Sequence, residues 1–347
     1  MSHQSLLLRD CVSRGPHPVG VATLDVPDPA EPQRRLLTDV WYPALPTRFE
    51  SALAANHPMN QPHDARNDAA PAPGPFPLIA FSHGNSGLRR QSTFLTTHLA
   101  SFGFVVTAPD HVGNTLFEMI KVTDEDERKR VHLEARRNRP RDLATAIEVV
   151  TKPPGEQRGR WPEVAPTAIG VLGHSFGGWT AMKMPALDAR ISAVCGLAPA
   201  SEPFVGRKAF EKDELPFSRK IPTLLVAGLE DVLVDVDTSV RRLFDRLEQP
   251  RALVGVRGAD HFHFCDGIQL LHGLHERNVR PKQTRETQRY ADLLQEERTH
   301  RVLRALVAHF FAATLRVGGA SGLPLPDLSN EVLTELDPAL SRLDAPA

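Results

Sequence analysis

The sequence predicts an α/β fold with a mostly parallel central sheet and helices on both faces. Short apolar runs alternate with segments of helical periodicity from about residue 76 onward. The runs are apolar along their whole length, which is typical of strands that are buried on both faces. Strands that alternate with helices favour parallel pairing, because a helix returns the chain to the start of the next strand.

The elements follow one another in a regular order. Two more strands, over residues 19–26 and 35–42, resemble a hairpin that precedes the core. Core strands are expected over residues 75–82, 104–108, 168–172, 191–197, 222–227 and 252–256. Helices are expected over residues 91–102, 141–150, the segment after Ser175, 238–247 and 298–315. Gly103 is well placed to end the first of these helices, because glycine commonly follows a helix.

Residues 1–347 are expected to form a single domain, because no internal repeat or domain-scale linker interrupts the alternation. Three insertions and a tail stand outside the pattern. They are a flexible loop at 43–75, a segment at 115–139, a second insertion at 266–295 and a C-terminal tail at 318–347. The segment 115–139 contains a dense run of charged residues, which predicts a solvated helix, with a lid over the site as the alternative.

The composition is that of an ordinary globular protein. Of the 347 residues, 41% are hydrophobic and 24% are charged, and the formal net charge is -1. This balance gives no reason to expect nucleic acid or an anionic membrane as a partner. The oligomeric state cannot be predicted from it. No run approaches the roughly 18 apolar residues of a membrane span, so no stable membrane insertion is expected.

The cysteines and histidines indicate neither disulfides nor metal. Cys11, Cys195 and Cys265 are far apart and form no C-x-x-C pair, so a reducing compartment is favoured and we expect a cytoplasmic protein. Histidine pairs such as His272 and His275 have no convincing third ligand. The sequence contains no P-loop and no H-E-x-x-H motif, and we expect no cofactor and no metal.

The central motif is Gly173-His-Ser-Phe-Gly177, which directly follows an apolar strand and precedes a helical segment. A G-x-S-x-G turn from strand to helix needs glycines, because side chains there would collide with neighbouring backbone. Such a turn presents its serine hydroxyl above the sheet, at the N-terminus of a helix that favours negative charge. Ser175 is therefore the candidate nucleophile.

The loop after the first core strand, Phe81-Ser-His-Gly-Asn85, is the second element. In proteins that contain such an elbow, this loop supplies one backbone N–H to the oxyanion hole, and the residue after the nucleophile supplies the other. Asn85 and Phe176 are the predicted donors. His83 and His174 are expected to shape the loops that hold them.

An acid and a base follow in the chain order Ser, Asp, His that accompanies this elbow. Asp231 follows a strand at its carboxyl end, and we expect it to orient the histidine, with the adjacent Glu230 pointing away. His261 follows the last core strand at a Gly-marked turn and is the predicted base, with His263 as its competitor. The prediction is a triad of Ser175, Asp231 and His261.

These blocks, with Leu99-Ala-Ser-Phe-Gly-Phe-Val-Val106 and Asp39-Val-Trp-Tyr-Pro43, resemble the platelet-activating-factor acetylhydrolase and predicted dienelactone-hydrolase branch of the α/β hydrolases. Cutinase-like polyesterases are similar in the same blocks. Dienelactone hydrolases have a cysteine where Ser175 stands, which argues against their substrate. The acetylhydrolases have their acid one strand earlier, where this chain has no aspartate. Asp231 occupies the position that the cutinase-like enzymes use, and Glu202 is the fallback acid.

The resemblance implies the α/β-hydrolase fold and a serine hydrolase that cleaves carboxylic esters through an acyl-enzyme. The substrate is expected to be a soluble small-molecule ester of short to medium acyl length, because the 115–139 segment is charged rather than apolar. Three alternatives stay open. They are a hydrolase of a thioester, lactone or amide, an acyltransferase, and a catalytically silent binding module.

Overall fold

The computed structural model describes residues 7–46, 63–201, 209–277, 285–315 and 324–344. The strands are β1 (Val19–Pro27), β2 (Arg35–Pro43), β3 (Arg66–Asn67), β4 (Phe76–Ser82), β5 (Val105–Pro109), β6 (Val164–His174), β7 (Ile191–Leu197), β8 (Thr223–Gly228), β9 (Arg251–Val256) and β10 (Leu340–Arg342). The helices are α1 (Thr93–Ser101), α2 (Leu116–Met119), α3 (Glu125–Thr151), α4 (Phe176–Leu187), α6 (Arg241–Asp245), α7 (Ile268–Arg277), α8 (Glu296–Thr314) and α9 (Asn330–Leu336).

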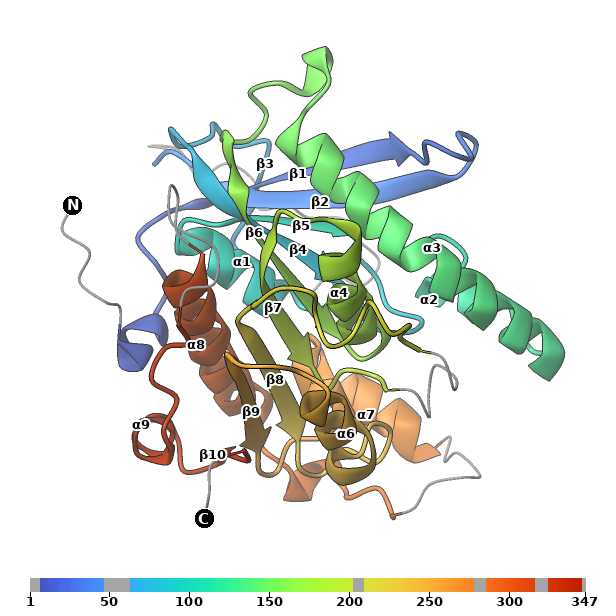
Figure 1. The fold of residues 1–347 in the computed structure, drawn as a ribbon, viewed down its shortest axis with the longest axis vertical. Helices are drawn as coiled ribbons and strands as arrows, with labels where there is room; N and C mark the ends of the chain where they lie inside the picture. The colour runs from blue at the N-terminus through green and yellow to red at the C-terminus, as the bar shows by residue number, and fades with distance from the viewer. Residues whose placement is uncertain (1–6, 47–62, 202–208, 278–284, 316–323, 345–347) are drawn as a thin grey trace.

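All the strands belong to one sheet with the order β10-β9-β8-β7-β6-β4-β5-β2-β1-β3 (Figure 1). Neighbours from β9 to β5 pair in parallel, as the alternation of strands and helices predicted. The expected hairpin is present as antiparallel β1 and β2, and β2 joins the core against β5. At the opposite edge, β10 of the C-terminal segment pairs antiparallel with β9. The predicted α/β architecture is confirmed.

Helix α3 joins two segments that the sequence analysis treated separately, the solvated helix expected within 115–139 and the helix expected over 141–150. It runs from Glu125 to Thr151 without interruption, with Pro140 inside it, and Asp124 caps its first turn through the N–H of Glu127. The acidic residues of that turn stabilise the helix, because their negative charge interacts favourably with the positive end of the helix dipole. Charged residues at 125–130 are exposed, whereas Val131, Ala135 and Arg139 are buried, so the charged run and the packed face belong to one helix.

The single-domain division stays a prediction. Within its segments, the described part of 266–295 contains α7, and the described part of 318–347 contains α9 and β10. Residues 47–62 of the expected 43–75 loop lie outside the described residues, as do 278–284, 316–323 and 345–347.

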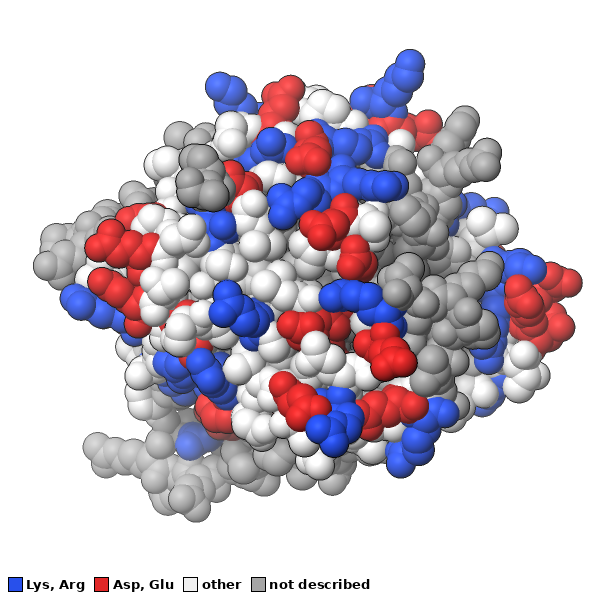
Figure 2. All heavy atoms as spheres, turned by 90° about the horizontal axis from the view of Figure 1, so that it is seen from below, with Lys and Arg blue, Asp and Glu red and all other residues white. Residues whose placement is uncertain are grey.

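The face in Figure 2 has basic and acidic side chains interspersed, as the near-zero net charge suggests. Protein surfaces that bind nucleic acid carry extended patches of basic residues. Among its described residues, this face shows no such patch. In the described part of the chain, no helix combines the length and apolarity of a membrane span.

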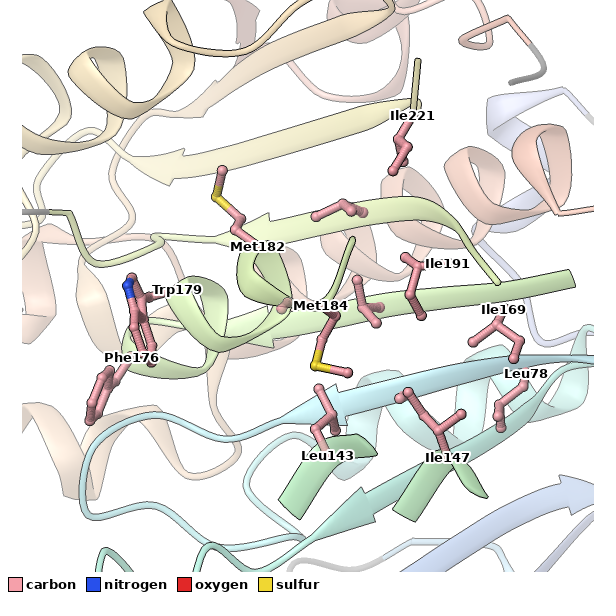
Figure 3. Packing of buried hydrophobic residues seen from close by; sticks show 14 of the residues in the cluster. Leu78, Leu143, Ile147, Ile169, Phe176, Trp179, Met182, Met184, Ile191 and Ile221 are labelled. Atoms are coloured by element: carbon pink, nitrogen blue, oxygen red, sulfur yellow. The ribbon is translucent and has the colours of Figure 1, made fainter. Parts of the chain in front are cut away.

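Two apolar layers cover the sheet. Helices α1 and α8 pack on one face, and α3 and α4 pack on the other. Figure 3 shows part of the second layer, in which Leu143 and Ile147 of α3 and Met184 of α4 lie over Leu78 and Ile169 of the sheet. Helix α4 is buried on nearly every side. The strand-to-helix turn before it is therefore held between packed elements.

Candidate active site

The turn between β6 and α4 places Ser175 in a backbone conformation that L residues rarely adopt. Its φ is 56° and its ψ is -119°. A Cβ on Gly173 would lie 2.0 Å from the carbonyl oxygen of Gly177, and a Cβ on Gly177 would lie 1.9 Å from that of Ser82. Only glycine fits at these positions, because a real Cβ cannot approach backbone oxygen so closely. The turn packs α4 closely against β4 and places Ser175 at the carboxyl end of the sheet.

The structure brings together the three residues that the sequence singled out. Ser175 Oγ lies 2.9 Å from His261 Nε2, and His261 Nδ1 lies 2.7 Å from Asp231 Oδ2. Asp231 follows β8 and His261 follows β9, so both reach the rim where parallel strands end. The arrangement has the connectivity of a serine-hydrolase triad.

Asp231 is completely buried and its second oxygen is also occupied. Oδ1 accepts the backbone N–H groups of Leu233 at 2.7 Å and Val234 at 2.8 Å. The carboxylate is thus fixed by its own loop with Oδ2 directed at the imidazole. Glu230 accepts a hydrogen bond from Gln288 instead. Glu202 lies outside the described residues.

The loop that contains His261 is held by a second buried carboxylate. Asp260 Oδ1 lies 2.6 Å from His263 Nδ1, and Asp260 Oδ2 contacts His272 Nδ1. Burial alone would raise the pKa of Asp260, but hydrogen bonds from the two histidines hold it below its ordinary value. The hydrogen bond to Asp260 raises the pKa of His272 despite burial. His263 is therefore a structural partner of Asp260, while His261 faces the serine.

The carbonyl of Ser175 is fixed by the backbone N–H groups of Trp179 at 3.2 Å and Ala200 at 2.9 Å. A trans peptide is planar, so its N–H points opposite to its C=O, and the orientation of the Phe176 N–H is thereby set. On the other loop, the N–H of Gly84 donates to Gln91 Oε1 at 2.8 Å. The amide of Gln91 also lies 3.0 Å from His174 Nδ1, so one side chain links both predicted loops.

Ser175 and His261 line a cavity of about 380 Å³. Its walls combine Gly84 and the predicted oxyanion donor Asn85 with apolar side chains of α2, of α7 and of the segments before α1 and α7, namely Leu116, Leu271, Leu274, Leu88 and Phe262. A larger hollow of about 740 Å³ lies between α1 and α8 and contains none of the triad residues. The smaller cavity is the candidate site because it contains the polar groups that converge.

The same connectivity occurs a second time nearby. Ser82 Oγ lies 2.8 Å from His111 Nε2, and His111 Nδ1 lies 2.9 Å from Asp142 Oδ2. Ser82 is fully buried and lines neither of the two cavities described above. Burial, together with the nearby cations Arg139 and Arg34, holds the pKa of His111 well below its ordinary value. A neutral His111 donates to Asp142 and accepts from Ser82, so this array is a brace rather than a reaction centre.

Sequence reasoning missed Arg139, His111 and Gln91, which support the loop 82–85 from behind. It placed Arg139 at the end of the segment 115–139, which was expected to be solvated, yet the side chain is 0% exposed. The described residues hold no group of three or more side chains with the arrangement of a metal site.

Comparisons with known proteins concern the family resemblance and the fold. The model of the family "Platelet-activating factor acetylhydrolase, isoform II" matches residues 53–144, which include β4, the loop 82–85 and most of α3. Among solved structures, the ferulic acid esterase from Streptomyces cinnamoneus is similar, with a TM-score of 0.68 and 24% identity over 94% of this chain and 97% of that chain. The α/β-hydrolase fold is confirmed, and so is the resemblance to platelet-activating-factor acetylhydrolases, over residues 53–144.

Proposed function

We propose that this protein is a serine esterase that hydrolyses carboxylic esters through an acyl-enzyme. One observation carries the proposal, namely the hydrogen-bonded series Ser175, His261 and Asp231 at the wall of a cavity. The family match and the similarity to a ferulic acid esterase support ester chemistry.

The proposed reaction has two halves. Ser175 Oγ attacks the ester carbonyl while His261 Nε2 accepts its proton, and the backbone N–H groups of Asn85 and Phe176 bind the resulting oxyanion. His261 then protonates the departing alcohol as the carbonyl re-forms. Water attacks the acyl-enzyme with His261 again as base. Asp231 holds Nδ1–H in place and stabilises the imidazolium that forms in each half.

We also propose esters of short to medium acyl length as substrates. A cavity of about 380 Å³ is at the small end of ligand sites, and the leucines of its wall suit an acyl chain. A series of p-nitrophenyl esters from acetate to palmitate tests this. Peak kcat/KM at butyrate to octanoate supports it, and peak turnover on long chains at an interface contradicts it.

Other acyl bonds remain the second reading, because one triad can cleave esters, thioesters, lactones and amides. Matched ester, thioester and anilide substrates distinguish these bonds. Product analysis with an added alcohol distinguishes hydrolysis from acyl transfer.

We also propose a reducing, cytoplasmic location. The three cysteines Cys11, Cys195 and Cys265 are buried free thiols, which supports it.

The decisive experiment labels the protein with a fluorophosphonate and maps the modified peptide. We expect the label on Ser175 and loss of both labelling and esterase activity in Ser175→Ala, with thermal unfolding nearly unchanged. Ser192→Ala is a matched control, because that hydroxyl is buried in β7 and contacts only the carbonyl of Ile169 at 3.2 Å among described hydrogen bonds. Wild-type turnover in Ser175→Ala would refute the proposed nucleophile, whereas failure of the wild-type protein to react with the label would favour a binding module.

A further inference from the structure

Arg139 is a fully buried cation that contacts the predicted oxyanion loop. Its Nη2–H group donates to the carbonyl of His83, and its Nη1–H group lies 3.5 Å from the carbonyl of Gly84. His83 Nδ1 lies 2.7 Å from the same Gly84 carbonyl. The peptide unit that begins with this carbonyl ends with the N–H of Asn85. Because the unit is planar and trans, fixing the carbonyl direction also fixes the N–H direction.

The same guanidinium reaches the elbow on the other side. Its Nε–H donates to Thr180 Oγ1 at 3.2 Å, and that hydroxyl donates to the carbonyl of Phe176 at 3.0 Å. The guanidinium carbon also lies 4.7 Å from the centre of the Phe176 ring. Asn114 Oδ1 accepts a further hydrogen bond from Nη1 at 2.7 Å. One side chain therefore joins the two segments that contain the predicted oxyanion donors.

Arg139 is held without a direct ion pair in the part of the chain that the structure describes, since no carboxylate lies within 4.0 Å of it. Burial lowers the pKa of this guanidinium to about 9, with Asp142 opposing the shift. The group remains a cation at neutral pH, and burying a cation among neutral acceptors is unfavourable unless it is well hydrogen-bonded. Its charge is therefore available to stabilise negative charge that forms nearby.

The Ser82 array braces the loop at its other end. Arg139 Nη2 lies 3.3 Å from Ser82 Oγ, whose proton is directed to His111. Asp142, which holds His111, is itself bound by two nitrogens of Arg34 at 2.5 and 2.9 Å. The strand end at Ser82 is thus tied to α3 by a series of directional contacts, so the position of Arg139 relative to the loop is well defined.

We propose that Arg139 is a positioning residue for the oxyanion hole, which aims the Asn85 N–H by holding the Gly84 carbonyl and places positive charge behind the hole. The inference rests on the proposed esterase function. It predicts that Arg139 matters more for the tetrahedral intermediate than for the bound ester, because negative charge develops on the carbonyl oxygen only when Ser175 has attacked.

The experiment compares Arg139→Gln and Arg139→Lys with Arg251→Gln. Arg251 is a matched control, because it also donates to two backbone carbonyls, of Phe244 and Leu247, and stacks at 4.3 Å on a phenylalanine ring. It stands at the start of β9, at the opposite end from His261. For each variant, kcat and KM on p-nitrophenyl butyrate are measured together with thermal unfolding.

A trifluoromethyl ketone with the same acyl chain supplies the second measurement. Ser175 Oγ forms a bond to its carbonyl carbon, the carbonyl π electrons move to oxygen, and His261 accepts the serine proton, so the adduct mimics the tetrahedral intermediate. We expect Arg139→Gln to lower kcat and ketone affinity in parallel by about tenfold to a hundredfold, with KM changed less than about threefold. Lysine should restore part of the loss, because it keeps the charge but not the planar fork.

Two results would overturn the proposal. The first is a folded Arg139→Gln with wild-type kcat and ketone affinity. The second is a loss of kcat no larger than that of Arg251→Gln at equal loss of thermal stability, which would make the residue purely structural. If the glutamine variant does not fold, Arg139→Lys is judged by the same two criteria. Wild-type activity in Ser175→Ala would instead refute Ser175 as the nucleophile on which the proposed function rests, so the two failures are distinguishable.

Discussion

Replacement of Asp231 by asparagine tests whether this carboxylate sets the tautomer of His261. Oδ1 of Asp231 accepts two backbone N–H groups, from Leu233 at 2.7 Å and Val234 at 2.8 Å. The amide oxygen of asparagine must take that position, so its NH₂ group faces His261 Nδ1. Nδ1 then accepts a hydrogen bond, and the ring proton moves to Nε2, where it blocks transfer from Ser175.

The expected effect is large on activity and small on stability. In serine proteases the equivalent change lowers kcat about 10⁴-fold with the geometry intact, which corresponds to about 5.5 kcal/mol of transition-state stabilisation. We expect a loss of that order for Asp231→Asn on p-nitrophenyl butyrate. The melting temperature should change by only a few degrees, because both backbone hydrogen bonds of the loop are retained.

Asp235→Asn is the matched control for this experiment. Asp235 also accepts two backbone N–H groups, from Asp237 and Thr238, but it does not contact His261. Its variant should keep wild-type kcat. A kcat for Asp231→Asn within about tenfold of wild type would refute the tautomer argument. A larger loss in Glu202→Gln than in Asp231→Asn would move the acid to that residue.

Three further changes test other parts of the structure. Gly177→Ala places a Cβ 1.9 Å from the Ser82 carbonyl oxygen. We expect it to lower the melting temperature and to lower kcat by about 100-fold. Gly155→Ala is the control and should change neither, because a Cβ there meets nothing within 4 Å. Burial lowers the pKa of His98 to about 4, so the unfolded chain takes up a proton between pH 6.5 and about 4 that the folded chain does not. The free energy of unfolding should therefore fall as pH falls through that window, by on the order of 3 kcal/mol from this group. In urea unfolding, His98→Gln should show a flatter pH dependence of that free energy. An unchanged pH dependence would contradict the lowered pKa of His98. Leu271→Ala should raise the kcat/KM ratio of octanoate to acetate roughly tenfold by enlarging the cavity, and an unchanged ratio would place the acyl chain elsewhere.

The triad positions could be predicted because they depend on features that are local in the sequence. Ser175, Asp231 and His261 each follow an apolar run at its carboxyl end. Parallel pairing brings such ends to one rim whatever the details of packing. The order of the strands in the sheet was not needed for this inference.

Arg139 could not be assigned in the same way, because the sequence places it beside a charged run. Its burial depends on which side of α3 meets the sheet. A signal was nevertheless present, since Ala135, Arg139, Leu143 and Ile147 are spaced four residues apart and share one face of the helix. An arginine in such an apolar series is a candidate for a buried functional contact.

The supporting contacts of the site had no local signal at all. His272 reaches Asp260 from α7, and His111 joins Ser82 to Asp142 across three separate segments. Such pairs are defined by tertiary packing between distant segments. One sequence without homologues gives no information about which of its fifteen histidines will meet which carboxylate.

The short strand β10 has a consequence for solubility. An outermost strand with unpaired N–H and C=O groups is a template for association with other molecules, and β9, which is apolar after Arg251, would be such a template. Leu340, Ser341 and Arg342 occupy those groups antiparallel to Val256, Gly255 and Val254. By pairing with β9, β10 thus protects this edge from edge-to-edge aggregation. The protected strand is the one that His261 follows in the chain.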